Sequence, residues 1–127
     1  MSLVLRLQAD RRSLDMNEFG ELISATRKSL AMSQRELAAK VTKEDGQPIS
    51  MQYLNDIEHG RRNPPTSEHL MEQFAKALRL RKDRLMVTAG YLPSDIVEPI
   101  KRLSRTDPDK AETVLRAFRR QLDSLKR

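Results

Sequence analysis

The sequence contains no cysteine and no tryptophan, and its only histidines are His59 and His69. Without cysteine the chain can form neither a disulfide framework nor a thiolate metal site, and two histidines are too few for a zinc cage. We therefore expect no bound metal and no cofactor. The lack of cysteine also fits a reducing compartment, so we expect the protein to be cytoplasmic.

Long apolar runs are missing too. No stretch of 18 apolar residues occurs, so we expect no membrane-spanning segment. The first seven residues are too short and too soon charged, at Arg6, for a signal peptide. The four glycines are isolated, so none forms a glycine-rich phosphate loop, and no set of nucleophile, base and orienting group stands out. We predict that the protein is not an enzyme.

Basic residues are what the chain has in excess. It carries 24 Lys and Arg against 18 Asp and Glu, a net charge of +6 and a pI near 10.0. Such a balance favours polyanionic partners, nucleic acid first and anionic membrane second. Most of the excess lies in residues 101–127. With 127 residues the chain is long enough for one domain with an arm or a tail.

Apolar residues recur with helical spacing, and no segment alternates with period two over a useful length. Capping boxes at Asp15–Glu18 and Ser33–Glu36 and glycines at 60 and 90 suggest where helices begin and end. We therefore predict an all-α protein with helices at about 16–30, 33–42, 50–59, 66–79, 81–89 and 108–125. Residues 42–48 form a loop, and Pro93 and Pro99 interrupt a short helical stretch.

The core is expected to come from the inward faces of these helices. The residues assigned to it are Phe19, Leu22, Ile23, Thr26, Leu30, Leu37, Ala38, Val41, Tyr53, Leu54, Ile57, Leu70, Phe74, Ala77, Leu78, Leu85 and Met86.

Three regions follow from this pattern. Residues 1–16 form an N-terminal arm, 17–92 form the helical domain, and 93–127 form a C-terminal helical extension. The last helix carries an apolar stripe that includes Val114, Phe118 and Leu122. The stripe is either a dimerisation surface or packs back on its own domain.

Three motifs occur in order along residues 17–92. They are Phe19-Gly20…Ile23…Arg27, then Ser33-Gln34-Arg35-Glu36-Leu37-Ala38, then Ile49-Ser50…Tyr53-Leu54…Ile57-Glu58-His59-Gly60-Arg61-Arg62-Asn63-Pro64. Together they make this region, about 60% of the chain, resemble the lambda-repressor/Cro-like (Xre-type) DNA-binding family.

The resemblance implies a five-helix domain with a helix-turn-helix at 33–59 and an ion pair between Arg27 and Glu58. Residues 42–48 depart from the family pattern, because they make the connection between the second and third helices about six residues longer than usual. Either this is a tolerated surface insertion or Lys43 or Gln47 touches a phosphate.

The helix at 50–59 is expected to enter the major groove of DNA and contact base edges. Leu54 and Ile57 point inward, so helical geometry turns Met51, Gln52 and Asn55 outward, together with Asp56 and His59. The amides of Gln52 and Asn55 suit adenine N6 and N7, and Met51 suits a thymine methyl group. Asp56 repels phosphates unless it accepts from cytosine N4 or pairs with a neighbouring base.

Phosphate contacts are expected on both sides of that helix. Ser33 and Gln34 open a helix whose exposed N–H groups suit an anion, as the family resemblance also implies, and the Tyr53 hydroxyl can donate to a phosphate. Arg61, Arg62 and Asn63 flank the groove. The predicted DNA-binding residues are Ser33, Gln34, Ser50, Met51, Gln52, Tyr53, Asn55, Arg61, Arg62 and Asn63.

The favoured function is a sequence-specific regulator of transcription that binds double-stranded DNA as a homodimer, more often a repressor in this family. The alternative is an antitoxin or restriction-modification controller whose C-terminal helix holds a protein partner. A pure protein-interaction module is disfavoured by the neutral amides on the helix at 50–59 and by the arginines that follow it.

Overall fold

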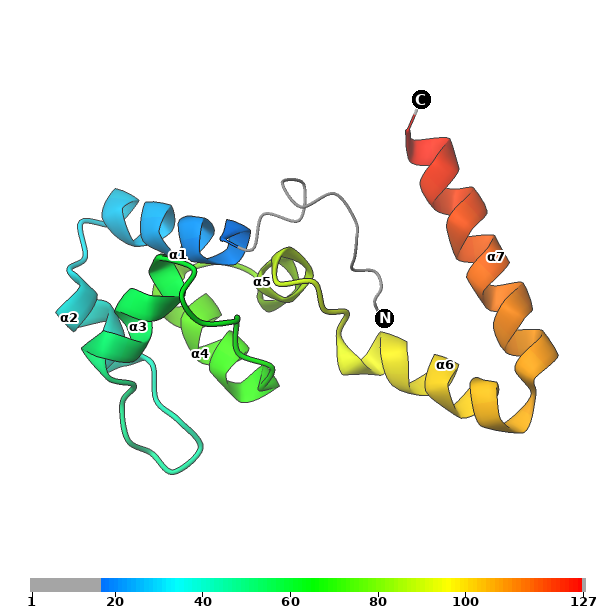
Figure 1. The fold of residues 1–127 in the computed structure, drawn as a ribbon, viewed down its shortest axis with the longest axis horizontal. Coiled ribbons are helices and arrows are strands. Elements are labelled where there is room, and N and C mark those ends of the chain that lie inside the picture. The colour runs from blue at the N-terminus through cyan, green and yellow to red at the C-terminus, as the bar shows by residue number, and fades with distance from the viewer. Residues whose placement is uncertain (1–16, 127) are drawn as a thin grey trace. The chain divides into compact units, whose positions relative to one another are not determined.

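The computed structural model describes residues 17–126, so the expected arm at 1–16 lies outside the described residues. The described part contains helices and a single isolated antiparallel bridge, Thr42–Pro48, which confirms the all-α prediction (Figure 1). The helices are α1 (Glu18–Ser29), α2 (Gln34–Lys40), α3 (Met51–Glu58), α4 (Glu68–Leu78), α5 (Lys82–Thr88), α6 (Ser94–Thr106) and α7 (Pro108–Leu125).

The expected caps set the bounds of α2 and α3. Ser33 Oγ accepts from the Glu36 backbone N–H at 3.0 Å, and a Glu36 carboxylate oxygen accepts from the Ser33 N–H at 2.8 Å. This reciprocal pair is a capping box. At α3 the Ser50 Oγ accepts from the Tyr53 N–H, and Gly60 ends the helix with a φ of +73°. Both helices therefore have ends fixed by their own sequence.

The core of α1–α5 is one continuous cluster. Within it Phe19 and Phe74 meet in an edge-to-face arrangement, with ring centroids 6.3 Å apart. The prediction for α4 was partly wrong, because Met71 and Ala75 are buried whereas Leu70 and Ala77 are only partly so. The cause is that α4 packs against three helices, α1, α2 and α5. Their contacts bury a wider part of the helix surface than one stripe along a single face.

Gly20 allows α1 and α3 to cross closely. A Cβ atom at this position would collide with the backbone carbonyl oxygen of Ile57 and lie 2.9 Å from that of Glu58. Because these neighbours are backbone atoms of a helix packed on the core, they cannot move aside cheaply. Glycine at position 20 thus sets how deeply α3 sits against α1, a role that was not predicted from the sequence.

The connection between α2 and α3 is a hairpin-like loop. The Lys43 N–H donates to the Gln47 carbonyl at 2.8 Å, and the Ile49 N–H donates to the Val41 carbonyl at 2.9 Å. Val41 and Ile49 are themselves buried in the core. The loop therefore leaves the core and returns to it at adjacent points.

Side chains of α4 anchor the base of this loop. The Thr42 hydroxyl donates to Gln73 Oε1 at 2.9 Å, and His69 Nε2 lies 3.0 Å from the Thr42 carbonyl oxygen. Farther along, the Ser67 hydroxyl donates to a Glu44 carboxylate oxygen at 3.1 Å. These hydrogen bonds hold the loop on α4 even though its tip is exposed.

The chain divides into two compact units, with the boundary between Tyr91 and Leu92. In the second unit, α6 runs through Pro99, which corrects the prediction that this proline interrupts the helix. Proline removes the N–H that would bond to the Asp95 carbonyl, but Asp95 is exposed, so water can replace that donor. Asp107 then caps α7 by accepting from the Lys110 N–H at 3.2 Å.

None of the helices in residues 17–126 is long and apolar enough to cross a membrane.

Candidate nucleic-acid interface

The helix pair α2–α3 has one buried side and one exposed side. Leu54 and Ile57 of α3 are in the core, where α3 packs against α1 and α2. Met51 and Gln52 are exposed on the opposite side, as helical geometry predicts. Asn55 is half-buried. The first turn of α3 therefore presents a sulfur-containing side chain and an amide to solvent.

A buried ion pair fastens α1 to the end of α3. The Arg27 guanidinium donates to both carboxylate oxygens of Glu58, at 2.7 and 3.0 Å, and its remaining nitrogen donates to the Met32 carbonyl at 2.8 Å. Arg27 and Glu58 are only 8% and 6% exposed. The structure thus contains the ion pair implied by the family resemblance.

The protonation of Glu58 follows from its partners. Burial alone would raise the pKa of this carboxyl, but hydrogen bonds from Arg27 and Gln34, together with the nearby positive charges, hold the pKa below its ordinary value. Glu58 is therefore ionised at neutral pH and keeps the bidentate geometry with Arg27.

Gln34, at the start of α2, reaches α3. Its Nε2 donates to a Glu58 carboxylate oxygen at 3.0 Å and to Asn55 Oδ1 at 3.3 Å. Two residues predicted to contact DNA, Gln34 and Asn55, are thus joined to each other. Because both donors of Gln34 are used within the protein, a side-chain contact from Gln34 to a phosphate requires a rearrangement of these hydrogen bonds.

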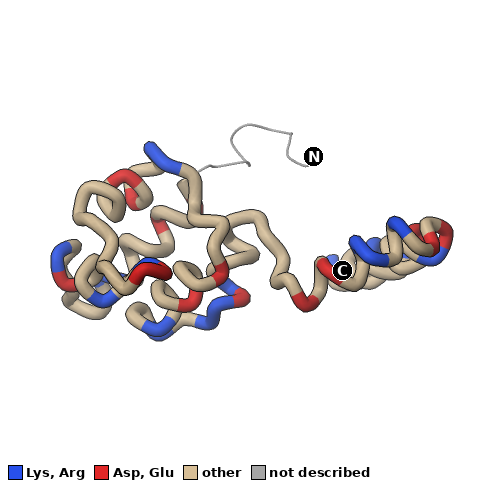
Figure 2. The backbone as a smooth tube through the Cα atoms, turned by 90° about the horizontal axis from the view of Figure 1, so that it is seen from below, with Lys and Arg blue, Asp and Glu red and all other residues tan. Residues whose placement is uncertain are grey.

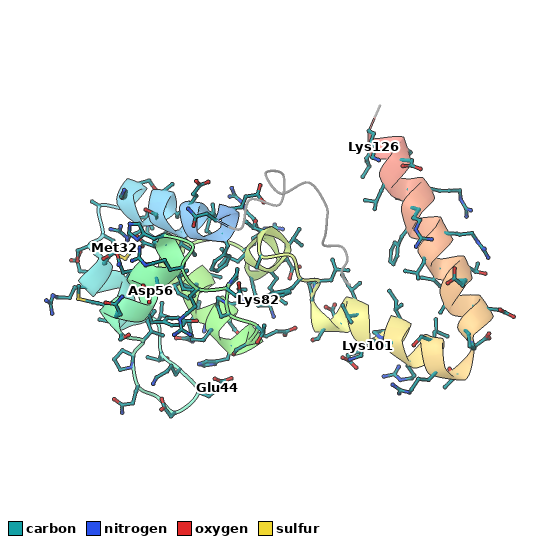
Figure 3. The ribbon with its side chains drawn as sticks, viewed as in Figure 1. Met32, Glu44, Asp56, Lys82, Lys101 and Lys126 are labelled. Atoms are coloured by element: carbon teal, nitrogen blue, oxygen red, sulfur yellow. The ribbon has the colours of Figure 1, made fainter. Side chains whose placement is uncertain are left out.

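A second chain of hydrogen bonds runs along the exposed side of α3. Gln52 Nε2 donates to Asp56 Oδ1 at 2.9 Å, and Arg61 Nε donates to the same oxygen at 3.1 Å (Figure 3, where Asp56 is labelled). The sequence left open that Asp56 pairs with a neighbouring base, but the hydrogen bond from Gln52 that completes this cluster was not predicted. Its i, i+4 spacing to Gln52 was the available signal.

Arg62 and Tyr53 also form a pair. The Arg62 guanidinium carbon lies 5.1 Å from the centre of the Tyr53 ring, within range for a cation–π contact. Burial raises the pKa of Tyr53 despite the opposing effect of the Arg62 charge, so the phenol stays protonated at neutral pH. The Tyr53 hydroxyl can therefore act as a hydrogen-bond donor.

The remaining predicted residues lie near the same two helices along the chain. Ser33 and Ser50 cap α2 and α3 through their side-chain oxygens, while Asn63 is exposed two residues beyond Arg61. Within residues 17–126 no group of three or more His, Asp and Glu side chains could hold a metal ion. The chemistry on offer here is hydrogen bonding by amides, hydroxyls and guanidinium groups.

Comparison with known proteins finds two curated relatives in strains of Mycobacterium tuberculosis, each described as an uncharacterized HTH-type transcriptional regulator. Each is 32% identical over 88 residues, which cover 69% of this chain and 57% of the relative. The chain thus matches little more than half the length of these relatives. No protein-family model and no solved structure matches. Over most of its own length, the chain is similar to HTH-type transcriptional regulators.

Proposed function

We propose that this protein is a sequence-specific regulator of transcription that binds double-stranded DNA through a lambda-repressor/Cro-like helix-turn-helix, with α3 in the major groove. The observation that carries the proposal is the exposed side of α3. Its neutral amide Gln52 is held by Asp56, and the capped start of α2 and the arginines after α3 flank it along the chain. Such a surface combines groups for base edges with groups for phosphates.

Each group has a role in this proposal. Gln52 and Asn55 recognise adenine, and Met51 contacts a thymine methyl group. Arg61 and Arg62 bind phosphates beside the groove, as does the protonated Tyr53 hydroxyl. The backbone N–H groups at the starts of α2 and α3, which Ser33 and Ser50 cap, face the phosphates of the DNA backbone. Gln34 and Asn63 make further polar contacts with the DNA.

We further propose that the protein binds DNA as a homodimer and acts as a repressor. One copy offers only a few base contacts, whereas two copies read half-sites about 34 Å apart. Binding at a promoter would exclude the transcription machinery. The names of the relatives support a regulator of transcription. The alternative, an antitoxin or restriction-modification controller, uses the same DNA-binding surface but has a protein partner on 93–127.

Selection of bound duplexes from a random DNA pool tests the proposal. We expect a palindromic consensus. Failure to enrich any duplex, or binding to duplex DNA no better than to heparin, would contradict it.

Two substitutions then separate base from phosphate contacts. Gln52→Ala should cost about 1–3 kcal/mol at one base position and relax the specificity there. Arg61→Ala should weaken binding to all sequences alike and reduce the slope of log affinity against log salt by about one. Arg84→Ala, at an exposed arginine on α5, is the matched control and should leave binding unchanged. An equal loss on cognate and random DNA for Gln52→Ala would remove Gln52 from the base contacts.

A further inference from the structure

The helical hairpin α6–α7 leaves its apolar face largely uncovered. Phe118, Leu122 and Leu125 of α7 are 45%, 59% and 72% exposed, although they continue the stripe that begins at Ala111, which is 5% exposed. The two helices diverge from the turn at Asp107 (Figure 1). Coverage by α6 is therefore good only near the turn, and the exposure of the stripe rises toward the end of α7.

Two helices of this length cannot bury two amphipathic faces on their own. A helix shields only part of its neighbour, and helices gain most of their stability by packing their apolar faces in a shared core, as in four-helix bundles. Exposed apolar residues in a row, as opposed to scattered ones, indicate a surface that binds something.

The charges of the hairpin favour a second copy of itself. In α7 and its cap, residues 107–115 carry three acidic groups and one basic group, whereas residues 116–126 carry four basic groups and one acidic group. In α6 the acidic groups, Asp95 and Glu98, come first, and three basic residues follow. Figure 2 shows both signs along this hairpin. Helices with this polarity attract one another when antiparallel and repel one another when parallel.

We propose that the α6–α7 hairpin pairs with the same hairpin of a second copy to form an antiparallel four-helix bundle, with Phe118 near the two-fold axis. Phe118 is the midpoint of the stripe from Ala111 to Leu125, so a two-fold axis there lets each half of the stripe cover the other. In an all-antiparallel bundle every helix has neighbours of opposite direction, which places acidic segments beside basic ones at each contact.

Other occupants fit the face less well. DNA would require the basic groups, whereas the uncovered stripe is apolar. The stripe holds a single aromatic residue, Phe118, and so lacks the aromatic bulk usual at membrane interfaces. The charge pattern of the hairpin is complementary to itself, so a second copy fits it better than a different protein does.

Sedimentation equilibrium of the full chain without DNA tests the pairing. We expect a dimer in the wild type and at least a 100-fold larger dimer dissociation constant in Phe118→Glu and in Leu122→Glu. Val87→Glu is the matched control, because Val87 is 56% exposed on α5, outside the hairpin. Its dissociation constant should stay within threefold of the wild type. Circular dichroism checks that each variant keeps its helices.

A monomeric wild type at 100 μM would overturn the proposal, as would dimers of Phe118→Glu and Leu122→Glu as stable as the wild type. Because no DNA is present, these outcomes are independent of the DNA-binding proposal. A monomer that still enriches a duplex consensus would leave the proposed DNA binding standing and would reject this pairing together with the proposed homodimer.

Pulsed electron spin resonance tests the orientation. Because the chain has no cysteine, Gln121→Cys and Lys126→Cys each introduce one site for a spin label. In the antiparallel bundle the two labels are separated along the axis by about 9 Å at position 121 and about 24 Å at 126, from a rise of about 1.5 Å per residue. A parallel arrangement gives the same short distance at both positions and would contradict the proposal.

Discussion

At the residue scale, Asp56 occupies an unexpected place for an acidic side chain. It lies on the side of α3 that we propose faces DNA, yet it accepts from both Gln52 and Arg61. Its side chain is 23% exposed and forms an ion pair with Arg61 at 3.1 Å. We interpret Asp56 as the group that fixes the orientation of the Gln52 amide before DNA arrives, at the cost of repelling phosphates.

Two substitutions at Asp56 separate these effects. Both Asp56→Asn and Asp56→Ala remove the charge, so both should raise the affinity for random DNA, by up to about tenfold or 1.4 kcal/mol. Asn keeps an oxygen that can accept from Gln52, whereas Ala does not. Only Asp56→Ala should therefore lose discrimination at the base read by Gln52. Dissociation constants on cognate and random duplexes at one salt concentration measure both effects, and equal discrimination in the two variants would contradict this interpretation.

The exposed positions of α3 could be predicted because they depend only on helical periodicity and on which residues are apolar. Met51 and Gln52 are exposed for that reason. The bond between Gln34 and Asn55 could not be predicted, since it depends on how α2 and α3 cross. The capping box of α2 needed no such information, because both partners lie within four residues.

At the scale of elements, the Arg27–Glu58 pair determines how α1 holds α3. Glu58→Gln should lower the free energy of unfolding at pH 7 by about 3–5 kcal/mol, because it leaves the buried guanidinium without its counter-charge. Glu72→Gln, an exposed position on α4, is the control and should change it by less than about 0.5 kcal/mol. Urea unfolding measures both.

The same pair predicts a pH dependence. The folded-state pKa of Glu58 lies below its ordinary value of 4.5, so the unfolded chain binds the proton more readily. The stability from the ionised carboxylate is therefore complete above the unfolded pKa and is lost as pH falls through the folded pKa. Wild-type stability should fall more steeply than that of Glu58→Gln between pH 5 and pH 3. Parallel curves would show that Glu58 is not the titrating group.

Helices were easier to predict than the faces that they bury. Their bounds agree within a few residues, because proline, glycine and capping residues mark them. The buried arc of α4 was harder, since Met71 and Ala75 are buried only by the particular set of helices around them. Pro99 was also difficult to predict from the sequence. The α6 helix continues through it, because the Asp95 carbonyl that loses its N–H donor is exposed and can bond to water.

At the scale of the whole molecule, α1–α5 have their own core. The large cluster of buried residues runs from Phe19 to Met86, and none of it comes from the described residues 92–126. A chain that ends at Tyr91 should therefore keep its cooperative unfolding, with a midpoint within about 5 °C of the wild type. Differential scanning calorimetry measures this, and loss of a cooperative transition would show that the second unit supports the first.

The same truncated chain should sediment as a monomer and lose affinity for a duplex with two half-sites. Its affinity for a single half-site should be unchanged, which is the internal control. A truncated chain that still dimerises would place the contact between copies in α1–α5 or in residues 1–16.

The excess charge and the amphipathic last helix were visible in the sequence, because both are properties of composition and spacing. How far α6 covers α7 was not, since this depends on the angle between the helices. Ala111 is buried and Leu125 is exposed on the same stripe for that reason alone.

The loop between α2 and α3 has a consequence for evolution and for engineering. Because the Ile49 N–H donates to the Val41 carbonyl, the loop between these two residues leaves the core and returns to it at one place. At the tip, a Cβ atom at Gly46 would meet no other atom within 4 Å. The length of the loop can therefore change here, or a reporter group can be attached, while the position of α3 on the core stays the same.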